Sequence, residues 1–235
     1  MKIQHLFDEL IAITKNTESD FEDSGMINRF QEMQYGFFPL CWGILTENNK
    51  LVETTPTTEI EEGAVMVLGN DFGTRNYVNG YVSNPEKRVG EIDSKTIINL
   101  LNAKVGINTS KTFFTNFYLG VRVNEKATMT KRVEDLTSGY KSLCFEFFVK
   151  QVNFIKPSII ICLGHDVKNA LIDSKTSFDK WAPKSNSIKR IHHECKHVLE
   201  SEIFGDRKFV LIPHPCDLRN FNESHMLKLN SILNN

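Results

Sequence analysis

Short, nearly continuous apolar runs recur along the chain from residue 65 onward, and stretches with helical spacing separate them. The four runs lie at residues 65–68, 112–117, 159–163 and 209–212. Runs of this length, rich in β-branched and aromatic residues, predict strands that are buried on both faces of a sheet. Because strands and helices alternate, we expect an α/β domain, a three-layer α/β/α sandwich with a mostly parallel, four-stranded central sheet.

Apolar residues at helical spacing predict the connecting helices. We expect these helices at residues 2–15, 26–35, 94–102, 132–154, 166–172 and 223–233. Pro157 follows the longest of them and predicts its end, because proline cannot continue a helix. Residues 36–60 contain several glycines, prolines and threonines, which predict an irregular segment with one strand near 41–44.

We expect residues 1–235 to form one domain, because no internal repeat or low-complexity linker interrupts the chain. Within it, residues 1–60 are expected to form a helical and irregular N-terminal extension packed on the rest. The first 14 residues alternate between charged and apolar side chains, as in an amphipathic helix rather than a signal peptide.

Composition adds limits to this picture. Hydrophobic residues make up 40% of the chain and charged residues 24%, and no apolar run approaches the length of a membrane span. The five cysteines are scattered, so we expect a reducing compartment, no disulfides and no iron–sulfur cluster. Cys144 and Cys162 lie in apolar runs and are predicted core residues. We therefore expect a monomeric cytoplasmic protein without membrane contact, cofactor or bound metal.

The net charge of −1 gives no overall electrostatic attraction to nucleic acid. A local basic rim would still be enough for DNA binding. The residues that could form one are Arg75, Lys87, Arg88, Arg122, Lys126, Lys131, Arg132 and Arg219. The alternative interpretation is a solvated surface of mixed charge, and the sequence leaves both open.

Polar residues stand at the carboxyl ends of the predicted strands. Asn70 and Asp71 follow the first strand, Asn116 lies at the end of the second, Gly164 and His165 follow the third, and His214 follows the fourth. In an open parallel sheet these ends share one edge, where ligands bind. A carboxylate there can orient or deprotonate water, and an imidazole can donate to a developing oxyanion. Singly such residues are more often turn or cap residues, but their shared position predicts a site.

Four segments in this order resemble the uracil-DNA glycosylase superfamily. They are Gly-Asn-Asp-Phe-Gly at 69–73, the Phe-rich strand ending in Asn at 113–116, the Pro-led apolar strand at 157–164, and His-Pro-Cys-Asp-Leu at 214–218. The resemblance spans about residues 63–225. It implies a protein that acts on DNA, a glycosylase that hydrolyses the N-glycosidic bond of uracil or another deaminated or damaged base.

The resemblance also implies roles for individual residues. Asp71 corresponds to the aspartate that positions water, and Asn70 to a position that is glutamate in the iron–sulfur branch of the family. Asn116 corresponds to the asparagine that reads the pyrimidine edge. His214 corresponds to the histidine that stabilises charge on the departing base. Leu218 corresponds to the apolar wedge that fills the gap left by a flipped nucleotide.

The chain departs from the family pattern at several positions. Phe72 stands where the family usually has proline, and Cys216 stands where it usually has serine. We therefore expect weak or unusual base selectivity. We group Phe72 with Tyr77 and Tyr81 as base-binding candidates, and the two tyrosines are candidates for stacking on the base.

A competing motif lies at residues 193–197, which read His-Glu-Cys-Lys-His. On a helix, His193 and His197 would face one Zn²⁺ ion, with Glu194 as the general base of a zinc-dependent hydrolase. Lys196 places a cation beside the metal, and no third ligand is evident, so we rank this alternative below the glycosylase. A third alternative is a nucleotide- or nucleic-acid-binding module of the same fold without catalysis.

Overall fold

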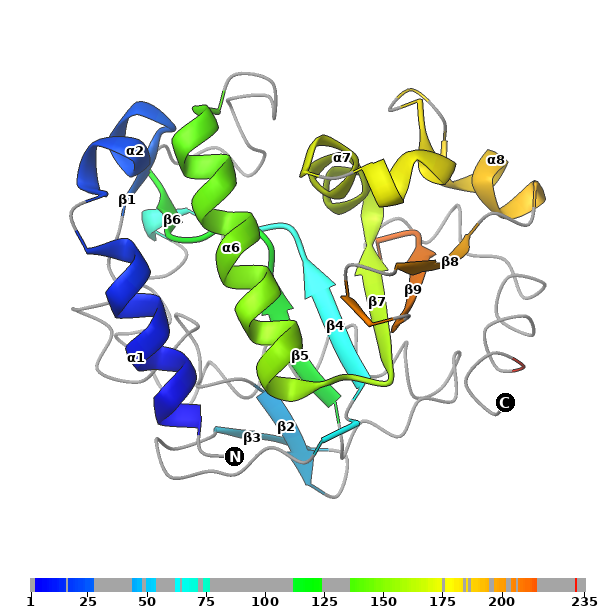
Figure 1. Ribbon diagram of the computed structural model, residues 1–235, viewed down its shortest axis with the longest axis horizontal. Coiled ribbons are helices and arrows are strands. Elements are labelled where there is room, and N and C mark those ends of the chain that lie inside the picture. Colours follow the sequence, from blue (N-terminus) through cyan, green and yellow to red (C-terminus); the bar gives the residue numbers. More distant parts are fainter. Residues whose placement is uncertain are drawn as a thin grey trace.

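The structure is a computed structural model of the 235-residue chain. It describes residues 3–15, 17–27, 44–47, 50–53, 62–63, 65–71, 74–76, 112–123, 136–174, 176–183, 185, 187–194, 197–201, 204–205, 207–214 and 231. Within these ranges the fold is α/β, as the sequence predicts. Figure 1 shows helices lying across one face of a central sheet.

Seven of the described strands form one sheet in the order β3-β2-β5-β4-β7-β9-β8. Their bounds are β2 Ile44–Glu47, β3 Lys50–Glu53, β4 Val65–Gly69, β5 Thr112–Asn116, β7 Ile159–Leu163, β8 Val198–Ser201 and β9 Arg207–Ile212. The central strands β5, β4, β7 and β9 are mutually parallel, and they are the four strands that the apolar runs predict. The predicted count of four is wrong, because the antiparallel strands β2, β3 and β8 extend the sheet at both edges.

Two further strands, β1 Met26–Ile27 and β6 Val121–Arg122, pair antiparallel in a small second sheet. The predicted helix at 26–35 is therefore wrong at its first two residues, and residues 28–35 lie outside the described part. A short helix, α2 Glu18–Asp23, precedes β1 instead. Met26 is buried, so the apolar residue that suggested a helix contributes to a strand pair.

The longer described helices follow the predicted pattern. They are α1 Ile3–Thr14, α6 Ser138–Ile155 and α7 Gly164–Ser174. The 3-10 helix η4 Thr176–Trp181 and helix α8 Ile188–His193 follow them and were not predicted. Helix α6 begins where the Thr137 side chain accepts a hydrogen bond from the Tyr140 backbone N–H, which caps its first turn. It ends at Lys156, whose φ of 46° is left-handed, directly before Pro157.

Some predicted elements lie outside the described residues: the helix at 94–102 entirely, and that at 223–233 apart from residue 231. Residues 132–135 of the longest predicted helix also lie outside the described residues. Residues 136 and 137 are described and precede α6, so the helix begins later than predicted. The strand expected near 41–44 is seen from Ile44 onward as β2.

Both faces of the central strands are buried. Alternate side chains such as Met66, Phe113 and Ile160 join one large cluster with the helices α1, α6 and α7. The intervening side chains, among them Val67 and Ile161, form a second cluster on the opposite face. Each such apolar side chain contributes about 1.5–3 kcal/mol when it is fully buried. This two-sided burial explains why the four strands appear in the sequence as continuous apolar runs rather than alternating ones.

Helices α1 and α6 lie side by side over the first cluster (Figure 1), and an ion pair of 2.7 Å joins Lys150 of α6 to Glu9 of α1. None of the described helices is both long enough and apolar enough to cross a membrane.

Candidate functional site

The strand register brings the predicted site residues to one edge of the sheet. Gly69 of β4 lies opposite Asn116 of β5, and Leu163 of β7 lies opposite Ile212 of β9. Strands β4 and β7, which lie between β5 and β9 in the sheet, are paired in parallel up to Leu68 and Cys162. The segments that follow β4 and β9 therefore leave the sheet at the same edge, with Asp71 in the first and His214 in the second.

Asn116 packs directly over the backbone of Gly69. A β-carbon placed on Gly69 would collide with Oδ1 of Asn116, so only glycine allows the amide to lie there. Pairing continues beyond the strands, because the backbone N–H of Phe117 donates to the Gly69 carbonyl at 2.9 Å. The N–H of Tyr118 donates to the Asn70 carbonyl at 2.8 Å. The amide of Asn116 is thus held beside the turn that leads to Asp71.

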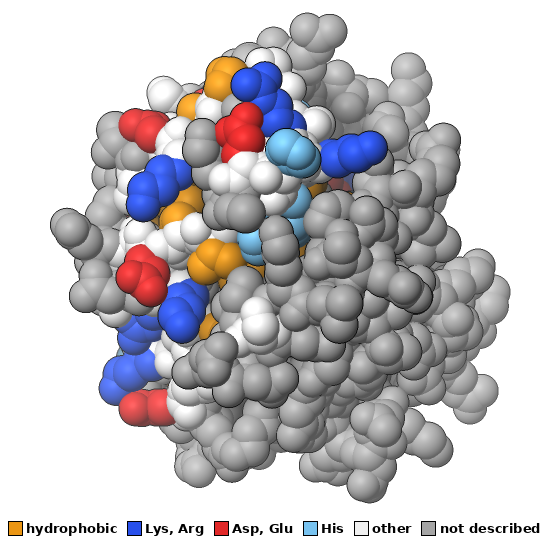
Figure 2. Space-filling model, turned by 90° about the vertical axis from the view of Figure 1, so that its right-hand side faces the viewer, with side chains coloured by type: hydrophobic (Ala, Val, Ile, Leu, Met, Phe, Trp, Pro, Cys, Tyr) orange, Lys and Arg blue, Asp and Glu red, His pale blue; other side chains and the backbone are white. Residues whose placement is uncertain are grey.

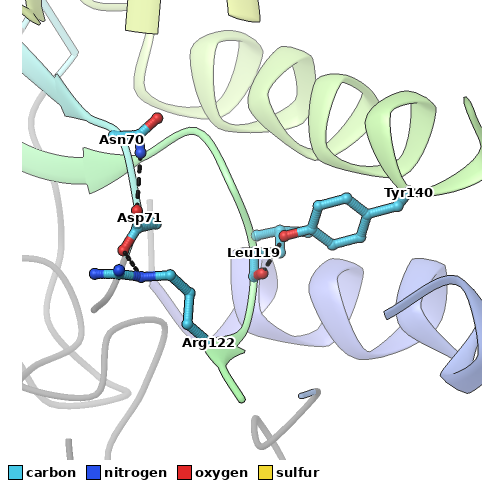
Figure 3. A network of polar contacts seen from close by, with 5 residues as sticks. All are labelled: Asn70, Asp71, Leu119, Arg122 and Tyr140. Carbon is cyan, nitrogen blue, oxygen red and sulfur yellow. Dashed lines mark hydrogen bonds and ion pairs between the residues drawn. The ribbon is translucent and has the colours of Figure 1, made fainter. Parts of the chain in front are cut away.

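Both carboxylate oxygens of Asp71 accept hydrogen bonds (Figure 3). Nε of Arg122 donates to Oδ1 at 3.1 Å, and Nδ2 of Asn70 donates to Oδ2 at 2.8 Å. The side chains of Arg122 and Asp71 are only 8% and 9% exposed. Charges this deeply buried require partners of opposite sign. A carboxylate has about four lone-pair sites, so this one retains capacity to accept a hydrogen bond from water.

Arg122 fixes the Asp71 loop through its backbone as well. An isolated parallel bridge joins it to Thr74, three residues beyond Asp71. The sequence grouped Arg122 with the possible phosphate-binding rim, but the structure buries its side chain against Asp71. Sequence reasoning missed this ion pair because the partners are 51 residues apart. The short apolar-basic pair Val121–Arg122 of β6 offered no signal for it.

Helix α6 anchors the segment that connects β5 to Arg122. The Tyr140 hydroxyl donates to the Leu119 carbonyl at 2.5 Å (Figure 3), and the Leu119 N–H donates to Sγ of Cys144 at 3.5 Å. Burial raises the pKa of Cys144 to about 12 and also raises the pKa of Tyr140. Both groups therefore stay protonated at neutral pH. The prediction that Cys144 and Cys162 are core residues is confirmed, since both side chains are fully buried.

The ends of β7 and β9 are in close contact. Gly164 has a φ of +85°, which favours glycine, and a β-carbon there would lie 3.1 Å from Cβ of His214. His214 is exposed, and it follows the buried Pro213. His214 is therefore exposed at this edge of the sheet, and its backbone position is fixed by the strand and by the contact with Gly164.

A polar cluster lies next to this contact, and the sequence pointed only to its first member, His165. It comprises His165, Lys168 and Asn169 in the first turns of α7. Nζ of Lys168 lies 3.2 Å from Nε2 of His165, and Nδ2 of Asn169 lies 3.1 Å from Nδ1 of the same ring. His165 was expected at this edge because it follows the third strand, whereas Lys168 and Asn169 were missed. The signal for Lys168 was its position between Val167 and Leu171 on the apolar face of the helix, where a charged residue is unexpected.

The competing zinc motif does not form the helix that it requires. Helix α8 ends at His193, Glu194 is its C-cap, and His197 lies just before β8. His193 is exposed, whereas the buried His197 stacks on His192 with ring centroids 4.4 Å apart. Glu194 forms an ion pair with Arg190 at 2.8 Å. No three His, Cys, Asp or Glu residues in the described part of the chain are placed to hold a metal ion.

Several predicted residues lie outside the described part of the chain. They are Phe72, Tyr77, Tyr81, Cys216 and Leu218, and, from the possible rim, Lys87, Arg88, Lys126, Lys131, Arg132 and Arg219. Arg75 is described and exposed. On the face shown in Figure 2, the coloured side chains mix Lys and Arg with Asp and Glu around a group of histidines. That face is a surface of mixed charge in its described part.

Comparison with known proteins assigns no family to the chain. No protein-family model matches it, and no curated protein sequence matches it. Functional inference therefore depends on the residues at the sheet edge and on their geometry.

Proposed function

We propose that the protein is a DNA glycosylase of the uracil-DNA glycosylase type. It hydrolyses the N-glycosidic bond of uracil or another deaminated or damaged base in DNA. The observation that supports this proposal is the common edge shared by Asp71, Asn116 and His214, which come from three parallel strands or the segments after them. The four sequence segments that resemble the superfamily supply the same residues in the same order.

The proposed roles follow from the chemistry of each group. Breaking the bond leaves positive charge on the sugar and negative charge on the base. The Asp71 carboxylate orients a water and stabilises the sugar cation. The His214 imidazole donates a hydrogen bond to the base carbonyl as charge builds on it. The Asn116 amide pairs with the edge of the extruded base, because it offers both donors and an acceptor.

The proposal includes the three-layer α/β/α arrangement. The second apolar cluster supports it, because Val67, Ile161 and Val210 are buried on the sheet face opposite to α1, α6 and α7. A buried apolar face requires a covering layer, and helices are the usual one over parallel strands.

Base release from DNA tests the proposal. Single- and double-stranded oligonucleotides, each with one uracil, hypoxanthine or other altered base, are incubated with the protein and then treated with alkali. We expect free base and strand cleavage at the altered position. Asp71→Asn and His214→Ala should each lower the rate, the second by about 10²–10³-fold if it removes one oxyanion donor. Asp179→Asn, at an exposed position on η4, is the control and should retain the rate.

A contrary result would be equally informative. If a broad panel of bases gives no release while the protein still binds DNA or nucleotides, the protein is a binding module and the glycosylase proposal is wrong. Stoichiometric zinc that is lost on His193→Ala would support the zinc-dependent hydrolase instead.

A further inference from the structure

Lys168 is a buried amine at the same edge of the sheet. Its side chain lies on the buried face of α7, and the residue is 0% exposed. Burial of a charged ammonium is unfavourable, so desolvation lowers the pKa of Lys168 to about 8. The neutral amine is therefore the minor form near neutral pH, but it is far more populated than in an ordinary lysine. This is the form of lysine that acts as a nucleophile.

His165, an exposed residue, contacts this amine. Its Nε2 is 3.2 Å from Nζ of Lys168, and its ring is exposed. A protonated amine can donate to Nε2, and a neutral amine can accept the Nε2 proton when the ring is in its other tautomer. Nδ1 of the ring faces the Asn169 amide at 3.1 Å, which orients the ring. Because Nδ2 of Asn169 can only donate, Nδ1 accepts and a neutral ring carries its proton on Nε2, so the hydrogen bond to Lys168 is made with the neutral amine as acceptor.

The cluster borders the proposed active site. Strands β4 and β7 are paired as far as Leu68 and Cys162, and helix α7, which begins at Gly164, contacts β4. The start of α7 therefore lies near the end of the strand that leads to Asp71. On its other side Gly164 contacts His214, with a β-carbon distance of 3.1 Å. Lys168 is one helical turn away from this contact.

We propose that Lys168 is the nucleophile of a second activity, the formation of a Schiff base with an aldehyde substrate. The substrate is the ring-opened deoxyribose that base release leaves in DNA, so its identity rests on the proposed function. The supporting geometry is a buried amine that contacts an exposed imidazole beside His214 and the Asp71 loop. The ring of His165 must turn aside for the aldehyde to reach Nζ.

The step is balanced without an oxidant or reductant. The amine nitrogen of Lys168 adds to the aldehyde carbon, which forms a C–N bond, and the carbonyl electron pair moves to oxygen. Transfer of both amine protons from nitrogen to that oxygen, which the His165 ring can mediate, lets the oxygen leave as water. The product is a C=N imine, and addition of water reverses the reaction.

Borohydride trapping tests this inference. An oligonucleotide whose abasic site is prepared without this protein is incubated with the full chain in the presence of sodium borohydride, which reduces an imine to a stable amine. We expect a covalent protein–DNA adduct on a denaturing gel and, by mass spectrometry of the wild-type adduct, attachment at Lys168. Lys168→Met should reduce the adduct at least tenfold. Lys189→Gln, at an exposed position on α8, should not reduce it.

The result that overturns the inference is the absence of an adduct, attachment only at other lysines, or an undiminished adduct with Lys168→Met. Mapping on the wild-type protein decides the question even if the variant folds poorly. The abasic substrate also separates the two proposals. Trapping without base release overturns the glycosylase proposal and keeps this inference, whereas base release without trapping does the reverse.

Discussion

At the scale of single residues, the pairing of Asp71 with Arg122 is the most consequential contact of the proposed site. The sequence predicted that Asp71 lies at the sheet edge, because a polar residue directly after a buried strand must be at its end. It could not predict Arg122, because long-range ion pairs leave no local pattern. Arg122 and Asn70 together hold both carboxylate oxygens, at 3.1 and 2.8 Å. Arg122 is therefore a positioning residue for the reaction that we propose.

We expect Arg122→Gln to destabilise the protein by about 3–5 kcal/mol, because it leaves the Asp71 charge buried without its cation. Urea unfolding monitored by circular dichroism measures the change. Arg190→Gln is the matched control, since Arg190 is 66% exposed in its pair with Glu194, and we expect little effect from it. A stability loss no larger than that of the control would show that the Asp71–Arg122 pair contributes little.

Lys168 gives a pH-dependent prediction whose sign follows from its depressed pKa. The folded-state pKa is about 8 and the ordinary value is 10.5, so between these values the unfolded chain binds more protons. Wild-type stability should therefore rise with pH in this interval, by up to roughly 3 kcal/mol relative to Lys168→Met. Below pH 8 the burial penalty is fully present, and Lys168→Met should be the more stable protein. Urea unfolding of both proteins at pH 7, 8, 9 and 10 measures the difference in their free energies of unfolding. If that difference does not change with pH, the depressed pKa of Lys168 is contradicted.

At the scale of elements, the sequence predicted correctly those strands that are buried on both faces and the helix whose apolar residues recur at helical spacing over many turns. The strands β4, β5, β7 and β9 and the helix α6 all belong to this group. The sequence did not predict β3 or β8, because side chains at the sheet edges are too polar to form an apolar run. Sequence periodicity also failed at Met26, where pairing with Arg122 rather than local propensity decides the structure.

The β4–β5 pair gives a prediction at this scale. Gly69→Ala places a methyl group where Oδ1 of Asn116 lies, so the amide must move away. Because the backbone hydrogen bonds of the pair remain, we expect a modest change in melting temperature but a large loss of base release. Uracil release and base preference are measured alongside thermal unfolding. Unchanged release and preference would show that the position of the Asn116 amide is unimportant for base recognition.

At the scale of the whole molecule, the charge distribution limits the DNA binding that we propose. The net charge is −1, so attraction to phosphates must come from a few local cations rather than from the overall field. Among the described residues, Arg75 is the exposed cation nearest in sequence to Asp71, and the bridge between its neighbour Thr74 and Arg122 fixes its loop.

We therefore expect Arg75→Gln to weaken binding to abasic and undamaged DNA to a similar degree, because a phosphate contact is independent of sequence. The slope of log K against log salt concentration should become shallower by about 1, the value for loss of one phosphate contact. Fluorescence anisotropy at several salt concentrations measures both quantities. Lys189→Gln serves as the control, because it removes one charge from α8, away from the Asp71 loop, and should leave the slope unchanged. If both variants change the slope equally, binding reflects net charge and not a rim at the proposed site.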